Sequence, residues 1–126
     1  RNIRFVVKEF PILGEASLIS SKFAIAVKNI GGLEEYKFVH DILLTLTADP
    51  SEAYLRRIAT ELQLDPEELF TAMESEPVLQ EISQTSELAK KLQIGGTPTF
   101  IFEEQVLRGF VPLDVLLQVA ETVRNK

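Results

Sequence analysis

The stretch that decides the fold of this chain is Gly95-Gly96-Thr97-Pro98-Thr99-Phe100-Ile101-Phe102. Two glycines precede a Thr-Pro bond, and an apolar strand sequence follows the proline directly. Because proline has no N–H group to donate to a β-ladder, Pro98 must lie where the strand begins. A cis bond in this turn would leave the backbone groups of Thr97 unpaired, and exposed backbone groups beside a sheet edge can pair with an extended peptide. Taken alone, the pattern predicts only a loop.

A hairpin and a final helix are predicted after this loop. Residues 99–102 and 105–108 have the composition of two short strands, and Glu103-Glu104 form the tight connection between them. Gly109 ends the second strand, and Pro112 begins a helix. The apolar positions of that helix are Leu113, Leu116, Leu117, Ala120 and Val123.

Five helices are predicted before the loop. Apolar residues recur at helical spacing over residues 15–30 and 33–46. Asp49-Pro50-Ser51 is a break and a cap for the third helix, Asp65 can cap the fourth, and Pro77 begins the fifth. The residues predicted to face inward on these helices are Ile19, Phe23, Val27, Ile30, Tyr36, Val39, Ile42, Leu43, Leu46, Leu55, Ile58, Ala59, Leu62, Leu69, Phe70, Met73, Val78, Ile82, Ala89 and Leu92.

The first element is predicted to be a strand over residues 3–10, which are rich in β-branched and aromatic side chains. Its run Phe5-Val6-Val7 favours burial on both faces, as in a parallel sheet. One such strand, a block of helices and a distant hairpin do not make a complete sheet. The order of elements therefore predicts a fold in which part of the sheet is missing.

Composition excludes several classes of function. The 126 residues carry a net charge of −6, which argues against nucleic acid as a partner because phosphates need a basic surface. No apolar run approaches the roughly 18 residues of a membrane span. The sequence has no cysteine, so these residues can form no disulfide and no thiolate metal site, and a single histidine, His40, cannot build a histidine metal cluster. We therefore expect no metal and no cofactor.

Four segments carry a further signal. They are Val7-Lys8-Glu9-Phe10-Pro11-Ile12-Leu13-Gly14, Tyr36-Lys37-Phe38-Val39-His40-Asp41-Ile42-Leu43, Ile94-Gly95-Gly96-Thr97-Pro98-Thr99-Phe100 and Arg108-Gly109-Phe110-Val111-Pro112-Leu113. In this order they resemble the strand-to-helix turn, a helix of the helical insertion, the cis-proline loop and the entry to the last helix of the DsbA-like branch of the thioredoxin superfamily. Together they extend over nearly the whole chain.

The resemblance implies an α/β, thioredoxin-like fold that is incomplete at its N-terminus. Residues 1–126 would form one partial domain. Residues 15–92 would be its helical insertion, and residues 93–126 would hold the cis-proline loop, the hairpin and the last helix.

The resemblance also implies a function, namely protein disulfide exchange by a secreted or periplasmic oxidoreductase that acts on cysteine-containing proteins or peptides. Thr97 and Pro98 would be its substrate-binding residues. In the family, a Cys-x-x-Cys motif and a central strand precede the first matched segment, and this chain begins after both. We therefore expect a portion of such an enzyme that is inactive by itself, whose missing central strand a dimer or strand exchange could replace.

Two other functions remain open. One is a glutathione-dependent enzyme of the same fold, such as the kappa-class glutathione transferases and hydroxychromene-carboxylate isomerases, which have a similar proline loop. The segment of residues 8–14 argues against it, because it resembles the redox branch. The other is a non-catalytic module that binds extended peptides at Thr97 and Pro98, which needs no cysteine.

Glu9 and His40 are the remaining residues of chemical interest. Glu9 ends the first predicted strand, and we expect a solvated carboxylate there, although burial would raise its pKa. His40 lies beside Val39, and its segment contains no second titratable partner. We therefore expect His40 to be a packed or surface residue rather than a catalytic base.

Overall fold

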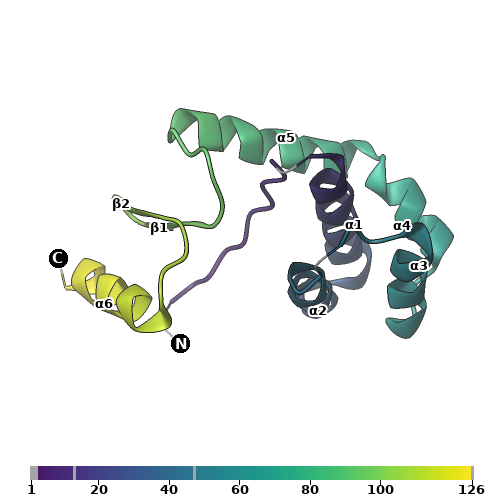
Figure 1. The fold of residues 1–126 in the computed structure, drawn as a ribbon, viewed down its shortest axis with the longest axis horizontal. Helices are drawn as coiled ribbons and strands as arrows, with labels where there is room; N and C mark the ends of the chain where they lie inside the picture. The colour runs from purple at the N-terminus through teal and green to yellow at the C-terminus, as the bar shows by residue number, and fades with distance from the viewer. Residues whose placement is uncertain (1–2, 13, 47, 126) are drawn as a thin grey trace. The chain divides into compact units, whose positions relative to one another are not determined.

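The computed structural model describes residues 3–12, 14–46 and 48–125. Figure 1 shows the order of the elements in this part of the chain, which is five helices, a hairpin and a last helix. The elements are α1 (Glu15–Gly31), α2 (Leu33–Leu44), α3 (Glu52–Glu61), α4 (Pro66–Met73), α5 (Glu76–Lys91), β1 (Thr99–Phe102), β2 (Gln105–Arg108) and α6 (Leu113–Arg124). The predicted α/β class and the order of these elements are confirmed.

The chain divides into two compact units. The helical unit, Glu9–Ser86, holds α1 to α4 and most of α5. The hairpin unit consists of Arg1–Lys8 and Glu87–Lys126, and it holds β1, β2 and α6. Each unit is described by itself below.

The core of the helical unit forms around α1. Five consecutive residues of this helix, from Phe23 to Val27, are buried, so the middle of α1 is enclosed on all sides. Helices α2 and α4 both pack against it. The predicted inward faces of α3 and α4 are confirmed, because Leu55, Ile58 and Leu69 are buried. Ile19, predicted to face inward at the start of α1, is exposed because the enclosed part of the helix begins one turn later.

Side-chain caps set the starts of two helices, as predicted. The hydroxyl of Ser51 accepts a hydrogen bond from the backbone N–H of Tyr54 at 3.1 Å at the start of α3. The carboxylate of Asp65 accepts one from the backbone N–H of Glu67 at 3.0 Å, and Pro66 occupies the first position of α4. These caps satisfy N–H groups that have no partner inside the helix.

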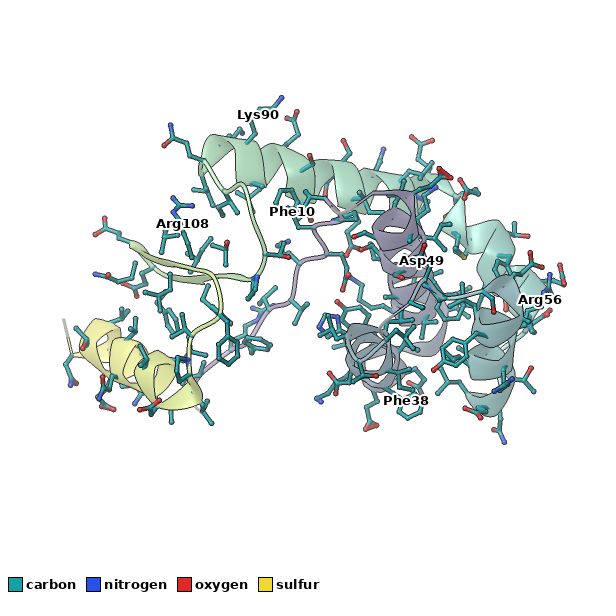
Figure 2. The ribbon with its side chains drawn as sticks, in the orientation of Figure 1. Phe10, Phe38, Asp49, Arg56, Lys90 and Arg108 are labelled. Atoms are coloured by element: carbon teal, nitrogen blue, oxygen red, sulfur yellow. The ribbon has the colours of Figure 1, made fainter. Side chains whose placement is uncertain are left out.

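Arg56 connects α3 with α4 (Figure 2). Its guanidinium lies 4.8 Å from the centre of the Phe70 ring, and it donates hydrogen bonds to Glu52 at 2.9 Å and to Glu67 at 2.5 Å. The Phe70 ring covers one face of the guanidinium, and the two carboxylates accept hydrogen bonds from the N–H groups at its edge.

In the hairpin unit, β1 and β2 pair antiparallel with the predicted bounds. Thr99 lies opposite Arg108 at one end of the ladder, and Phe102 lies opposite Gln105 at the other. Glu103 in the connection has φ 53°, a left-handed conformation that tight turns use. Helix α6 contacts β1, but a two-stranded hairpin offers little apolar surface, and Leu113, one of the apolar positions of this helix, is 69% exposed.

The predicted strand over residues 3–10 is wrong. The described residues of this segment form neither helix nor strand, and the sheet contains only β1 and β2. The expected burial is wrong too, because Phe5 is 74% exposed and Val6 is 57% exposed. The physical reason is that a strand needs a neighbour for its backbone N–H and C=O groups, and no described segment supplies one.

Candidate functional site

The Gly-Gly-Thr-Pro loop begins where α5 ends. Gln93 has a left-handed backbone conformation with φ 58°, and the backbone N–H of Ile94 donates a hydrogen bond to the carbonyl of Ala89 at 2.8 Å. This arrangement closes the last turn of α5 and sends the chain away from the helix. The side chain of Arg108, at the end of β2, donates a hydrogen bond to the carbonyl of Gln93 at 3.1 Å. The start of the loop is therefore held to the hairpin.

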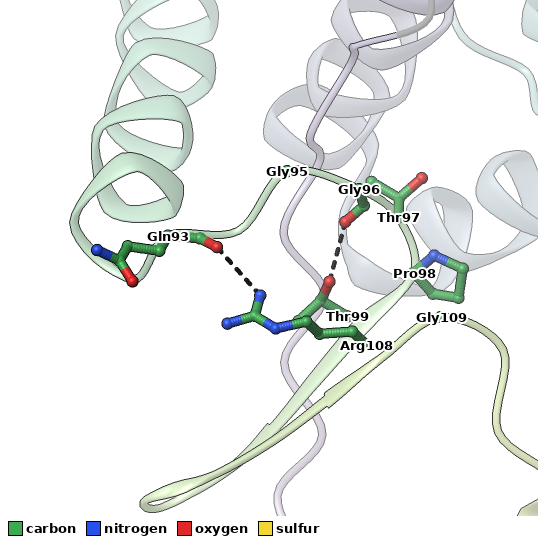
Figure 3. Close-up of a pocket in the computed structure, with 8 residues that line it drawn as sticks. All are labelled: Gln93, Gly95, Gly96, Thr97, Pro98, Thr99, Arg108 and Gly109. Atoms are coloured by element: carbon green, nitrogen blue, oxygen red, sulfur yellow. Dashed lines mark hydrogen bonds between the residues drawn. The ribbon is translucent and has the colours of Figure 1, made fainter.

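The second half of the loop is held by two more hydrogen bonds. The hydroxyl of Thr99 donates to the carbonyl of Gly96 at 2.9 Å (Figure 3). The backbone N–H of Gly109 donates to the carbonyl of Pro98 at 2.8 Å. The peptide bond between Thr97 and Pro98 is cis. These contacts fix the backbone on both sides of Thr97.

A pocket of about 400 Å³ lies along this loop. Its lining residues are Gln93, Gly95, Gly96, Thr97, Pro98, Thr99, Arg108 and Gly109. Thr97 and Pro98, the two predicted site residues, are both exposed in it. Within the described ranges, neither the backbone N–H nor the backbone C=O of Thr97 has a hydrogen-bond partner. The pocket therefore offers a donor and an acceptor of the main chain, beside strand β1, which in the described part of the chain pairs only with β2.

A second group of functional side chains lies in the helical unit and is centred on Glu9. One carboxylate oxygen of Glu9, Oε2, accepts a hydrogen bond from the hydroxyl of Tyr36 at 2.5 Å and lies 3.1 Å from Nδ1 of His40. The other oxygen, Oε1, accepts a hydrogen bond from the hydroxyl of Ser21 at 3.1 Å. The Glu9 side chain is only 13% exposed, so it is a partly buried carboxylate with three partners from α1 and α2.

These contacts shift the titration of all three ionisable groups. Burial alone would raise the pKa of Glu9, but the hydrogen bonds from His40, Tyr36 and Ser21 and the charge of His40 outweigh it, and the pKa lies below its ordinary value. The hydrogen bond to Glu9 raises the pKa of His40. Burial and the same carboxylate raise the pKa of Tyr36. The arrangement therefore favours an ionised Glu9, a protonated His40 and a neutral Tyr36.

Comparison with known proteins identifies the family. The family model of the DSBA-like thioredoxin domain matches residues 16–120 of this chain. The chain belongs to the DSBA-like thioredoxin domain family. Among curated proteins, no match to this DSBA-like chain was found.

Solved structures agree with this family. A thioredoxin-like oxidoreductase from Silicibacter pomeroyi DSS-3 is 34% identical, with a TM-score of 0.83 over 94% of this chain and 67% of that one. The thiol-disulfide exchange protein alpha-DsbA2 from Wolbachia pipientis is 26% identical, with a TM-score of 0.82 over 92% of this chain and 63% of that one. A periplasmic thioredoxin-like protein from Salmonella enterica serovar Typhimurium shares the fold at 20% identity, with a TM-score of 0.78 over 94% and 65%. This chain thus spans about two thirds of the length of these structures.

The structure corrects two sequence-based predictions for this DSBA-like domain. Glu9 was expected to be solvated, or to have a raised pKa if buried, but it is mostly buried and its pKa is lowered because three donors surround it. For His40, only its own segment was considered in the search for a titratable partner, and the structure supplies one from outside that segment, Glu9. The partners lie 12, 27 and 31 residues from Glu9 in the sequence, so no local pattern could show the group. The one available signal was the spacing of Tyr36 and His40, which places both on one face of α2.

In the part of this DSBA-like domain that the structure describes, no group of three or more His, Cys, Asp or Glu side chains could hold a metal ion. None of its described helices has the length and apolar character that crossing a membrane requires.

Proposed function

We propose that this chain is the portion of a thiol–disulfide oxidoreductase that binds the substrate, and that Thr97 and Pro98 are its substrate-binding residues. Its substrates are extended segments of cysteine-containing proteins or peptides. The family and the similarity to an oxidoreductase and to a thiol-disulfide exchange protein support this function.

The observation that carries the proposal is the free backbone of Thr97. Its N–H and C=O groups have no partner among the described residues, yet hydrogen bonds on both sides hold the loop in place. An extended peptide that lies along the loop gains two main-chain hydrogen bonds without rearrangement of the protein. Main-chain pairing of this kind does not depend on the identity of the substrate's side chains.

The redox step needs two cysteines that these 126 residues do not contain. In the exchange, a thiolate attacks one sulfur of a substrate disulfide, forms a mixed disulfide and releases the other sulfur as a thiolate. A second cysteine thiolate then attacks the mixed disulfide, which leaves the enzyme oxidised and the substrate reduced. The role proposed for this chain is to hold the substrate for those steps.

The same proposal includes a location and a division of the chain. An oxidising compartment, periplasmic or extracellular, suits disulfide exchange, and the Salmonella structure is that of a periplasmic protein. We propose residues 15–92 as the helical insertion and residues 93–126 as the part with the proline loop, hairpin and last helix. A second copy of the chain, or exchange of a strand, would complete the sheet.

The first experiment measures peptide binding at the loop. The ¹⁵N-labelled chain is titrated with a capped extended peptide in which serine replaces the substrate cysteine. We expect the amide signals of Gly95, Gly96 and Thr97 to shift, and the N–H of Thr97 to be protected from hydrogen exchange. Thr97→Pro removes that N–H and should abolish binding, whereas Thr97→Ala keeps both backbone groups and should bind normally. Equal binding by both variants would contradict the proposal.

The second experiment tests the redox function. The polypeptide that includes the residues encoded before Arg1 is assayed for reduction of a protein disulfide. We expect activity and a Cys-x-x-Cys motif in those residues. If the peptide binds but the polypeptide has no cysteine pair and no activity, a non-catalytic peptide-binding module is the better description. Competition by glutathione for the same amide signals would instead support the glutathione-dependent alternative.

A further inference from the structure

Arg108 is the only charged residue among the eight that line the pocket. We propose that Arg108 makes this pocket selective for substrate peptides that carry a carboxylate next to the residue that pairs with Thr97. The inference rests on the proposed function, because it names the class of peptide that the same site prefers.

The first argument is the position of the side chain. In the β1–β2 register Arg108 lies directly opposite Thr99, and residues that lie opposite each other in an antiparallel pair project from the same face. Thr99 is itself tied to Gly96 in the loop. Figure 3 shows the guanidinium on this side of the hairpin, where it reaches toward Gln93 at the entrance of the loop. The charge therefore lies on the same face of the hairpin as Thr99 and beside the loop that contains Thr97.

The second argument is the unused hydrogen-bonding capacity of the group. A guanidinium has five N–H donors, and among the described residues Arg108 has one hydrogen-bond partner, the carbonyl of Gln93. That bond orients the group and leaves donors for a ligand. The planar guanidinium matches a carboxylate, which it can bind through two parallel hydrogen bonds.

The third argument is the local charge. The whole chain has a net charge of −6, but the other seven lining residues are uncharged, and Lys90 and Lys91 lie in the last turn of α5 just before the loop. The acidic residues of the hairpin, Glu103 and Glu104, are at its other end. Three strand residues lie between each glutamate and the nearest pocket residue of its strand, a separation of roughly 13 Å, which exceeds the Debye length of about 8 Å at physiological salt. The pocket is thus a positive site on an acidic chain.

The test compares three peptides that differ only in charge. Each is a capped extended peptide with a central serine, flanked on both sides by Glu, by Gln or by Lys, and its affinity is read from the amide shifts of Gly95 and Gly96. We expect the Glu peptide to bind about three- to tenfold more tightly than the Gln peptide, with the Lys peptide weakest. The preference should shrink between about 50 mM and about 0.5 M salt because screening shortens the reach of the charge.

Substitutions of Arg108 test whether this residue provides the preference. Arg108→Gln should bind the Glu and Gln peptides equally, and Arg108→Lys should keep part of the preference because a point charge remains. Arg57→Gln, at an exposed position of α3 in the helical unit, removes the same charge elsewhere and should leave the preference unchanged. If Arg108→Gln does not fold, Arg108→Lys makes the assignment, because an undiminished preference in that variant would show that the planar guanidinium does not provide it.

The outcomes separate this inference from the proposed function. If all three peptides bind equally and shift the loop amides, selectivity by Arg108 is wrong and the peptide site stands. If the preference persists in Arg108→Gln, another residue provides it and the inference is also wrong. If none of the peptides shifts the loop amides, both the inference and the peptide site are overturned.

Discussion

Nδ1 of His40 lies 3.1 Å from the Oε2 oxygen of Glu9, although 31 residues separate the two in the sequence. Glu9 precedes the first helix and His40 lies on α2, so the contact ties the segment before α1 to the second helix. The hydroxyl of Tyr36 reaches the same oxygen. The carboxylate thus acts as a shared acceptor that fixes where the chain enters the helical unit.

Replacement of Glu9 by Gln should destabilise the helical unit. The amide keeps the shape of the side chain but removes the charge that the three donors share. Its NH2 group, unlike the carboxylate oxygen that it replaces, cannot accept a hydrogen bond. We expect a loss of about 1–3 kcal/mol in the free energy of unfolding, measured by urea denaturation. Glu34→Gln, at an exposed position of the same unit, is the matched control and should change stability by less than about 0.5 kcal/mol. Equal effects of both changes would show that the three contacts of Glu9 contribute nothing.

Tyr36→Phe removes one hydroxyl and leaves the ring in place. Because hydrogen bonds to charged groups are stronger than neutral ones, we expect a loss of about 1.5–3 kcal/mol. Tyr54→Phe is the control, since the structure gives the Tyr54 hydroxyl no partner among the described residues. In the double variant with Glu9→Gln, the loss should be smaller than the sum of the two single losses. Simple additivity would mean that Tyr36 and Glu9 stabilise the protein independently.

The free energy of unfolding should depend on pH in two directions. The pKa of Glu9 is lowered from 4.5, so its contribution is present above that value and is lost as the pH falls through the folded pKa. The pKa of His40 is raised from 6.5, so its contribution is full below that value and is lost as the pH rises through the folded pKa. Both contributions are present between pH 4.5 and pH 6.5, and stability should therefore be greatest there. Urea denaturation across this range measures it, and His40→Gln should remove the decline on the alkaline side. A decline that persists in this variant would have another source.

The cap of α4 offers a local test of helix stability. Asp65→Ala removes the acceptor of the Glu67 N–H and should cost about 1 kcal/mol. Asp65→Ser restores a capping oxygen and should recover most of that loss. Thermal or urea denaturation gives both values. If the Ser and Ala variants were equally unstable, the charge of Asp65 near the helix start, rather than its hydrogen bond, would be the stabilising feature.

Local signals were sufficient for most of the fold. Ser51 and Asp65 predicted helix starts because a cap depends on residues two or three positions away. The strands of the hairpin were predicted with their observed bounds because the connection at Glu103 joins neighbouring segments. The loop at Thr97 and Pro98 was found for the same reason, since glycine and proline restrict the backbone at their own positions.

What the sequence could not predict depends on distant contacts. Residues 3–10 have the composition of a strand, but a strand forms only where another segment pairs with it, and composition does not identify that partner. The contacts of Glu9 could not be predicted for a related reason, because the donors come from two helices that meet only after folding. Arg108 likewise gave no signal of its place in the pocket, because that place follows from its register opposite Thr99.

The register of the hairpin has a consequence for the loop. The side chain of Arg108 reaches Gln93 only because it projects from the same face of the hairpin as Thr99, and a slip of one residue would turn it to the opposite face. The backbone bond from Gly109 to Pro98 would be lost in the same slip. The register of the two strands therefore determines the conformation of the loop. A change in the Glu103-Glu104 turn that shifts this register would disrupt the pocket at the other end of the ladder.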